Sequence, residues 1–363
     1  MSNGTLNNSL PLALLLSLTF CFAIPAVAQM DLKVHPAPDF GADDVWLDQG
    51  APVPHHIADY RGHVVLIDFW EYTCINCIRD FGVVKRWYGK YHQYGLDVIG
   101  VHYGEFDFGF NVDNVRAAAQ RFRLPWPVVA DQKGSTWRAF ASDGWPNRYV
   151  IDPQGNIVMK VFGETNNHEL EAKILDLLAV AHPEVMKVDA DPDEDDGKPS
   201  CGVPTQETFV GEIYGRSAVE DMAGHHAGDE ADFQPPHSPP DGGVMLVGRW
   251  RVERDGIISE GHGAAAELRY HGRSLYSVLS LKDAKTIRVN LFQDGSPMPK
   301  EGAGADVKFD AKGAYLEVTD SRMYYLVRSP AFTAHLISLQ PESPGLGLNS
   351  FTFGNNCQLA DSP

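Results

Sequence analysis

The stretch "VVLIDFWEYTCINC", residues 64–77, joins an apolar run to two cysteines that lie three positions apart. The run before the cysteines is rich in β-branched and aromatic residues, which is typical of a buried strand. After the cysteines, apolar side chains recur at helical spacing from Ile78 to His92. The sequence therefore predicts a strand that ends just before Cys74 and a helix that begins at the cysteine pair.

This position of Cys74 and Cys77 favours redox chemistry over two alternatives. A zinc site needs four ligands, and no second Cys or His pair at compact spacing accompanies the first pair. A permanent bridge over two intervening residues closes too small a loop to stabilise a fold much. At a helix N-terminus, however, the unpaired N–H groups favour the thiolate, which is the form that attacks a disulfide. We therefore expect Cys74 to attack a partner's disulfide and Cys77 to resolve the mixed disulfide.

The first half of the chain alternates strand-like and helix-like segments. Further strands are expected at residues 96–103, 127–129, 148–152 and 157–162, and further helices at residues 111–123, 135–141 and 168–181. Strands that alternate with helices and end in a hairpin predict an α/β fold with a mixed sheet.

The second half, from about Glu207 to Phe353, has short β-rich runs separated by Gly, Asp, Asn and Pro. This pattern predicts an all-β sandwich. Residues 222–240 are expected to form a long surface excursion. A flexible polar loop is the favoured interpretation of its histidines, with a transition-metal site as the alternative; they are His225, His226 and His237.

The two halves are separated by "DADPDEDD", residues 189–196, which has six acidic residues in eight. Repulsion among these carboxylates predicts an extended, solvated linker over residues 187–200. The Asp-x-Asp-x-Asp start resembles a calcium loop, but Glu194 and Ser200 stand where such a loop needs Gly and Glu.

Residues 1–28 contain no Lys, Arg, Asp or Glu and end in the small-residue pattern Ala26-Val27-Ala28. We interpret them as a signal peptide, with an uncleaved anchor as the alternative. The mature chain is then expected to be soluble in the periplasm or another extracytoplasmic space, where disulfides form. The net charge of −18 argues against nucleic acid and anionic lipid as partners.

The opening stretch, followed by "GLDVIGVHY" (95–103) and "GWPNRYVIDPQGNIVMKVFGE" (144–164), resembles the extracytoplasmic thioredoxin-like proteins of the TlpA/ResA group, the redoxins. Within this group it is most similar to the soluble C-terminal part of DipZ-type proteins. The resemblance runs from about residue 45 to residue 178 and implies a thioredoxin fold over residues 35–182. It also implies a cis peptide bond at Pro146, facing the cysteines, and a substrate-binding backbone at Trp145.

Asp80 stands where members of the TlpA group usually carry a Glu just after the motif, so it is a candidate proton acceptor for the second thiol. The alternative for Asp80 is a plain carboxylate on the helix surface. Trp70 and Tyr72 flank the pair on the substrate side, although packing around the cysteines is their favoured role. Gly82 replaces a proline that often kinks this helix in the group.

The second half is similar to the jelly-roll module, related by fold to carbohydrate-binding domains, that follows thioredoxin in DipZ-type proteins. The similar segments are "ETFVGEIYGR" (207–216), "RWRVE" (249–253) and "SFTFGNNC" (350–357). This implies an all-β jelly-roll sandwich over residues 201–358. Glycan then becomes a candidate ligand, and a separate membrane protein of the CcdA/DsbD type becomes the candidate electron donor.

Cys201 and Cys357 bracket this second domain. Because free thiols are uncommon in an oxidising compartment, a structural disulfide is favoured over two free cysteines. Closing a loop of that length would stabilise the domain by roughly 4 to 5 kcal/mol in the chain-entropy estimate.

The sequence as a whole predicts a thiol:disulfide oxidoreductase that acts on protein disulfides or thiols, mainly as a reductant, and uses no cofactor or metal. One alternative is a glycan- or protein-binding module with a vestigial thioredoxin half. A more distant alternative is a thiol peroxidase, which would want Thr three residues before the reactive cysteine, where this chain has Glu71.

Overall fold

The computed structural model describes residues 35–47, 54–191, 202–212, 218–220, 222–234 and 238–355. The predicted signal peptide and the predicted disulfide between Cys201 and Cys357 lie outside the described residues, as does His237. The described residues all belong to one compact unit. In the described part of the chain, no helix has the length and apolar content needed to span a membrane.

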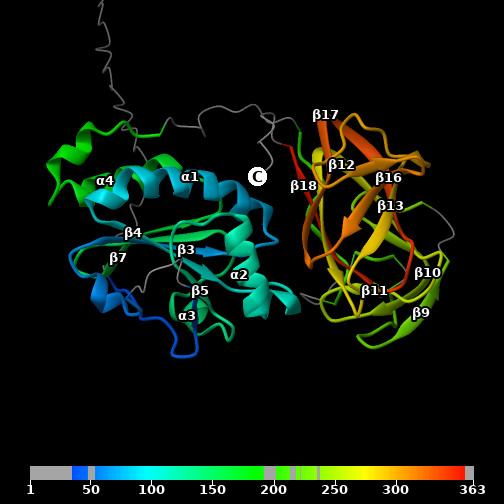
Figure 1. Ribbon diagram of the computed structural model, residues 1–363, viewed down its shortest axis with the longest axis horizontal. Helices are drawn as coiled ribbons and strands as arrows, with labels where there is room; N and C mark the ends of the chain where they lie inside the picture. Colours follow the sequence, from blue (N-terminus) through cyan, green and yellow to red (C-terminus); the bar gives the residue numbers. More distant parts are fainter. Residues whose placement is uncertain are drawn as a thin grey trace, which may run out of the picture. The chain divides into compact units, whose positions relative to one another are not determined.

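The first half folds into a seven-stranded mixed sheet with four α-helices (Figure 1). The sheet order is β1-β7-β6-β3-β4-β5-β2, with β3, β4 and β5 parallel and the other pairings antiparallel. The elements are β1 (His35–Pro36), β2 (Val45–Leu47), β3 (Val64–Trp70), α1 (Ile75–Tyr91), β4 (Leu96–His102), α2 (Val112–Arg121), β5 (Val128–Ala130), α3 (Ser135–Ala139), β6 (Asn147–Ile151), β7 (Asn156–Phe162) and α4 (Asn167–Leu178). Short 3₁₀ turns join them at Ile57–Tyr60, His92–Tyr94, Asp107–Phe110 and Pro183–Lys187. This is the predicted α/β thioredoxin fold.

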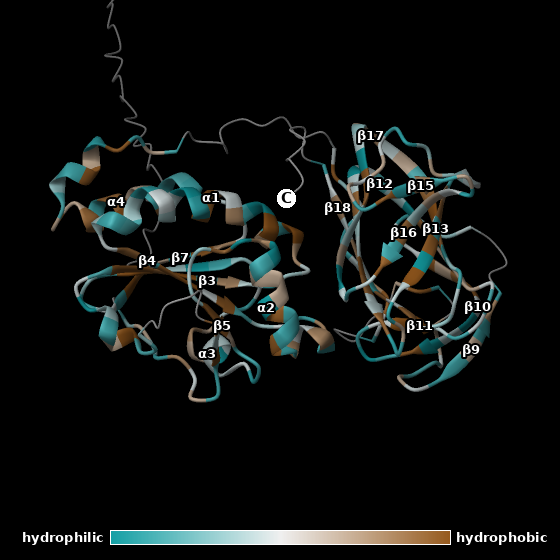
Figure 2. Cartoon of the chain, viewed as in Figure 1, coloured by the Kyte–Doolittle hydropathy of each residue, from teal (hydrophilic) through white to brown (hydrophobic). Residues whose placement is uncertain are grey.

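The sheet carries a separate apolar cluster on each face. Along β3, Val64, Leu66 and Trp70 pack with α1, α2 and α4, whereas Val65, Ile67 and Phe69 pack on the opposite side beside Phe140. Successive side chains of a strand point to opposite faces, so Asp68 lies on the face that α1 and α4 cover. Figure 2 shows β3 and β4 coloured as hydrophobic, in keeping with burial on both faces.

The helix after the cysteines is the longest in the described chain, and its boundaries follow from its ends. Cys74 is the N-cap residue of α1. The chain leaves this helix through a 3₁₀ turn that ends at Gly95, whose φ of 91° is in the left-handed region that glycine favours. The predicted apolar face is buried at Phe81, Val84 and Trp87.

The second half is an all-β structure around its own apolar core, as predicted. Eleven strands join through antiparallel pairings, in the order β15-β16-β13-β17-β12-β10-β11-β18-β8, with β14 beside β13 and β9 beside β10. The strands are β8 (Thr208–Phe209), β9 (Glu230–Phe233), β10 (Val244–Val252), β11 (Ile257–Ser259), β12 (Ala265–Leu281), β13 (Ile287–Gln293), β14 (Ser296–Pro297), β15 (Lys308–Asp310), β16 (Gly313–Val318), β17 (Arg322–Pro341) and β18 (Leu346–Gly354).

Two details of the second half differ from the prediction. The sequence pattern predicts separate strands at 266–272 and 274–281, and at 323–329 and 334–340. The first two are one strand, β12, and the last two are one strand, β17. β12 and β17 pair with each other along most of their length, across register shifts near Gly272 and Tyr276. The expected surface excursion also contains a strand, because β9 pairs with β10.

The first residues of the predicted solvated linker are partly docked on the thioredoxin half. Pro183–Lys187 is a 3₁₀ turn, and Asp191 is docked on α1. The Asp191 carboxylate pairs with Arg86 at 2.8 Å and with Lys90 at 2.6 Å. These two cations on one helix face offset the acidic charge that was expected to keep the segment in solvent. Residues 192–200 lie outside the described ranges.

Candidate active site

Cys74 and Cys77 occupy the first turn of α1, as predicted. Cys74 is partly buried and Cys77 is fully buried, and both are free thiols. The Cys77 backbone N–H donates a hydrogen bond to the Cys74 Sγ at 3.3 Å, which stabilises negative charge on that sulfur. Burial and the neighbouring Cys74 raise the pKa of Cys77 well above its ordinary value. The pair therefore has one accessible sulfur and one covered thiol that keeps its proton.

A buried carboxylate, Asp68, lies within electrostatic reach of Cys77. The side chain is 1% exposed, and its Oδ1 has no hydrogen-bond partner among the described residues. Burial, reinforced by the nearby Asp80 charge and opposed by Arg148, raises the pKa of Asp68 to about 7. The Asp68 charge in turn raises the pKa of Cys77. A carboxyl group with this pKa can exchange a proton near neutral pH.

Asp80, the predicted proton acceptor, is buried rather than on the helix surface. Its carboxylate forms an ion pair with the fully buried Arg148 on β6 at 3.1 Å. The same guanidinium donates to the carbonyls of Gly163 and Thr165 at 2.9 and 3.0 Å. Asp80 is therefore the anionic partner of a cation that ties α1 to the loop after β7.

A second buried acid, Glu71, shapes the loop that leads into Cys74. The Thr73 N–H donates to Glu71 Oε2 at 2.5 Å, and the Thr73 hydroxyl bonds to the same oxygen. The other oxygen lies 3.5 Å from His102 Nε2, and both of these atoms are buried. The Cys74 N–H donates to the Glu71 carbonyl at 3.2 Å. Glu71 thus holds the backbone just before the first cysteine.

Of the predicted substrate-side residues, Trp145 is half-buried and Pro146, Trp70 and Tyr72 are buried. The Trp145–Pro146 peptide bond is cis, as predicted. Trp145 lines a cleft of about 630 Å³, where its ring lies 4.8 Å from that of Trp137 and 6.2 Å from that of Tyr103. Trp70 has no exposed surface and packs edge-on against Phe81, which supports its packing role.

Tyr72 is 1% exposed, and its ring stacks on His102 at 5.3 Å. Its hydroxyl donates to the Phe108 carbonyl at 3.2 Å. It packs beside the pair and also lines the cavity described below. Over the described ranges, no three or more His, Cys, Asp or Glu side chains gather to hold a metal ion.

The sequence interpretation missed Asp68, Arg148 and His102. Each is a charged or titratable residue inside a run of apolar strand residues, which is an unusual place for such a side chain. Asp68 is paired with Arg148 in the β3–β6 register, and His102 is paired with Trp70 in the β3–β4 register. The polar residue inside each strand was the available signal, but only the register shows that these residues meet.

Both halves of the chain have counterparts among known families. Residues 34–160 match a model described as the AhpC/TSA family, and residues 205–354 match one described as a thioredoxin like C-terminal domain. Protein DipZ of Mycobacterium tuberculosis is 31% identical over 321 residues, which are 88% of this chain and 43% of DipZ. The chain therefore spans less than half the length of this relative.

Two further proteins match a shorter part of this chain, about the length of its thioredoxin half. Thiol-disulfide oxidoreductase ResA of Geobacillus thermodenitrificans is 28% identical over 135 residues, 37% of this chain and 72% of ResA. The crystal structure of a thiol-disulfide isomerase from Corynebacterium glutamicum aligns over 39% of this chain and 97% of that chain, with 24% identity and a TM-score of 0.33. The alignment with DipZ is long enough to run through both folded halves. The chain is therefore similar, over both folded halves, to TlpA/ResA/DipZ-like thioredoxin proteins.

Proposed function

We propose that this chain is a thiol:disulfide oxidoreductase that works outside the cytoplasm through its Cys-Ile-Asn-Cys pair, in the direction that reduces protein disulfides. The observation that carries the proposal is the first turn of α1. There an accessible sulfur caps the helix and a covered thiol lies one turn further on, beside a buried carboxylate. The names of the relatives point to the same chemistry.

The reaction has two steps. The Cys74 thiolate attacks one sulfur of the substrate disulfide, so that a mixed disulfide forms and the first substrate thiolate leaves. Cys77 then loses its proton and attacks the Cys74 sulfur, which releases the second substrate thiolate and forms the Cys74–Cys77 disulfide. The substrate gains two electrons and the protein loses two. A separate dithiol donor must return them.

Asp68 is the residue that we assign to the proton transfer. Cys77 is buried with a raised pKa, so it needs an acceptor before it can attack. Asp68 acts on Cys77 electrostatically, and its pKa of about 7 leaves a large ionised fraction at neutral pH. The Asp80 carboxylate forms an ion pair with Arg148 instead. In this proposal Asp80 is a positioning residue, because it acts through Arg148.

The reducing direction is proposed from the family resemblance. Strong protein oxidants owe their potential to a stabilised thiolate in the reduced form. Protein disulfides as substrates, a CcdA/DsbD-type electron donor and a glycan ligand for the β half remain predictions from the family resemblance.

Peroxide turnover is not favoured, although the first half matches a model described as AhpC/TSA. The position where a thiol peroxidase would want a Thr hydroxyl holds Glu71. Its carboxylate is buried and is bonded to Thr73.

The test is catalysis of insulin reduction by dithiothreitol with the wild-type chain and two single-sulfur variants. Cys74→Ser should lower the rate to the uncatalysed level, because the attacking sulfur is gone. Cys77→Ser should instead accumulate a mixed disulfide with the substrate, visible on a non-reducing gel. Undiminished turnover in Cys74→Ser would exclude the proposal. A reduction potential near thioredoxin's, about −270 mV, supports the reducing direction, and one near about −120 mV would reverse it.

A further inference from the structure

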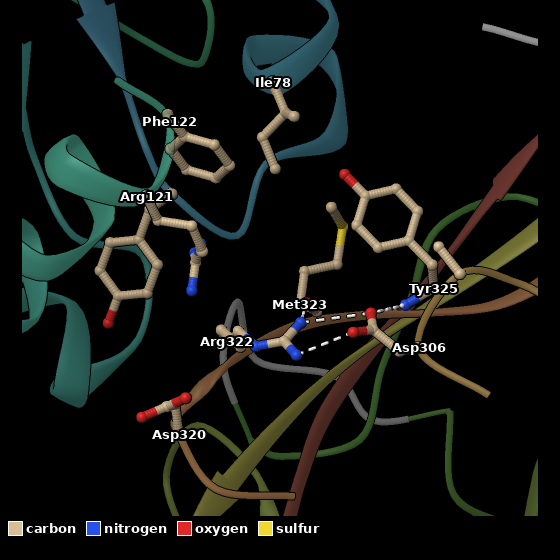
Figure 3. A pocket seen from close by; sticks show the side chains of 10 residues that line it. Ile78, Arg121, Phe122, Asp306, Asp320, Arg322, Met323 and Tyr325 are labelled. Atoms are coloured by element: carbon tan, nitrogen blue, oxygen red, sulfur yellow. Dashed lines mark hydrogen bonds and ion pairs between the residues drawn. The ribbon is translucent and has the colours of Figure 1, made fainter. Parts of the chain in front are cut away.

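A cavity of about 320 Å³ lies beside the first turn of α1, at the contact between the two halves of the chain. From the thioredoxin half, Ile78 and Phe122 line it, and from the β half, Met323 and Tyr325 do so (Figure 3). A cavity of this size falls at the lower end of the range of small-molecule sites and accommodates a single ring or a long side chain. The lining contains three apolar side chains, each at most 8% exposed: Ile78, Phe122 and Met323.

Residues on both sides of the attacking sulfur in the sequence line the cavity. They are Tyr72, two residues before Cys74, and Ile78, four residues after it. Cys74, Tyr276 and Tyr325 pack against the same apolar cluster. The Tyr276 and Tyr325 rings meet edge to face at 5.2 Å. A cavity lined this close to Cys74 along the chain is suited to the part of a substrate next to its disulfide.

The two arginines of the cavity differ in their partners. Arg322 is held by the Asp306 carboxylate in a two-pronged pair at 2.8 and 3.2 Å, and Asp306 also accepts the Tyr325 N–H at 2.8 Å. Arg121, at the end of α2, has no hydrogen bond or ion pair with any residue of the described ranges. Its guanidinium extends into the cavity toward Arg322, and its nearest described aromatic contact is the Phe122 ring at 4.8 Å (Figure 3).

Two polar groups of the cavity have no hydrogen-bond partner among the described residues: the guanidinium of Arg121, which is an exposed residue, and the Tyr325 hydroxyl. Desolvation and the neighbouring Arg322 charge lower the pKa of Arg121, and the Asp320 charge at the cavity rim opposes this shift. The Tyr325 hydroxyl oxygen is buried and has no hydrogen-bond partner in the described chain. A carboxylate is the group that accepts from both a guanidinium and a hydroxyl.

We propose that this cavity binds an apolar group carrying a carboxylate, on the segment of the disulfide substrate that lies next to the bond attacked by Cys74. The apolar part rests on Ile78, Phe122 and Met323, and the carboxylate accepts hydrogen bonds from Arg121 and Tyr325. The inference rests on the proposed thiol:disulfide function and names the class of substrate. It gives the β half a direct part in substrate selection.

The test compares two aromatic disulfides that differ in charge, 5,5′-dithiobis(2-nitrobenzoate) and the neutral 4,4′-dithiodipyridine. The reduced full chain is mixed with each under stopped flow, and the released aryl thiol is followed by absorbance. Arg121→Gln should slow the reaction with the carboxylated disulfide about tenfold, as expected for the loss of one charge-assisted hydrogen bond, and leave the neutral one unchanged. Tyr325→Phe should slow the carboxylated reagent about threefold.

The matched control is Arg116→Gln, which removes an exposed arginine of the same helix that does not line the cavity. It should react with both disulfides like the wild type, which separates the loss of a local contact from the loss of net charge. Near-ultraviolet circular dichroism checks that each variant is folded.

Equal slowing of both disulfides by Arg121→Gln would overturn the subsite, since the variant would then act on Cys74 itself. Unchanged rates with the carboxylated reagent would overturn it as well. A wild-type chain that reduces neither reagent would instead contradict the oxidoreductase function, and the subsite would fall with it. These outcomes distinguish failure of the subsite from failure of the function.

Discussion

The two halves of the molecule treat buried charge differently. The thioredoxin half covers five titratable side chains to 2% exposure or less around its cysteine pair: Asp68, Glu71, Asp80, His102 and Arg148. In the β half, the buried polar side chains are mainly Ser, Thr and Asn, and the buried charged ones, Asp255 and Arg273, keep 7% and 9% of their surface. Most of its ion pairs are partly exposed, as between Arg249 and Glu230.

This difference indicates where the chemistry lies. Taking a charge out of water is costly unless the charge is paired, so a stable fold has little reason to bury one without a use. Perturbed pKa values therefore cluster at functional sites. In this chain five of the groups that carry that cost lie around Cys74 and Cys77, while Asp131 accepts N–H groups at the start of α3 and Glu171 accepts from Tyr91 and the Asp191 N–H. The described β half is held together mainly by an apolar core. Three variants test the contrast.

The largest effect is expected for Arg148→Met. The variant leaves the Asp80 carboxylate buried without its cation, and it also removes the donors to the Gly163 and Thr165 carbonyls. We expect the free energy of unfolding in urea at pH 8 to fall by about 3 to 5 kcal/mol. The double variant Asp80→Asn/Arg148→Met should recover part of this loss. If the free energy of unfolding falls by less than about 1 kcal/mol, the Asp80–Arg148 pair is not shielded from water as its burial implies.

The next effect is expected for Asp68→Asn, and it depends on pH. The folded-state pKa of about 7 lies above the ordinary 3.8, so the native state holds its proton more tightly than the unfolded state does. The contribution of Asp68 to the free energy of unfolding of the wild type is therefore fully present below about pH 4 and is lost as the pH rises to about 7. The variant should be more stable than wild type by roughly 2 to 4 kcal/mol at pH 8, and should match it near pH 3.5.

The same variant should lose activity while it gains stability. Asn accepts no proton, so the resolving step slows, and insulin reduction at pH 7 should fall by at least about tenfold. The groups that face Asp68 are Asp80, Arg148 and Cys77. In wild type the rate should rise through about pH 7, whereas in the variant the rise should move to higher pH, toward the titration of Cys77 itself. An unchanged pH profile would remove Asp68 from the mechanism.

The smallest effect is expected for Arg249→Met in the β half, the counterpart of the Arg148 variant. The Arg249 guanidinium pairs with Glu230 and Asp232, but all three side chains are at least 41% exposed. Water can replace the lost partner of each carboxylate, so no resolvable change in urea unfolding or in insulin reduction is expected. A loss comparable to that of Arg148→Met would erase the contrast between the halves.

Elements whose pattern is local could be predicted from the sequence. The strand of residues 64–70, the helix after it and the later strands of the thioredoxin half all follow from apolar periodicity, which a single segment carries by itself. The predicted breaks within β12 and β17 were wrong. Gly272 and Pro330 suggest turns locally, but the pairing of β12 with β17 carries both strands past these residues.

The candidate site likewise has a part that could be predicted from the sequence and a part that could not. Its two sulfurs and its cis proline are visible in a few consecutive residues, and the group resemblance adds the role of each. Asp80 was the candidate proton acceptor because members of the TlpA group usually carry a Glu at its position just after the motif. In the folded chain Asp80 pairs with Arg148, which is 68 residues away, and Asp68 is the carboxylate that acts on Cys77.

The sequence by itself therefore determined that a dithiol pair stands at the start of a helix, that an α/β half precedes an all-β half, and which residues have the chemistry for redox work. Only the tertiary structure decided which carboxylate lies by the second thiol, how far each group is removed from water, and that β17 lines a cavity beside the first turn of α1. The reason is that a pKa is set by burial and by neighbours brought together over long stretches of chain, and no local pattern specifies either.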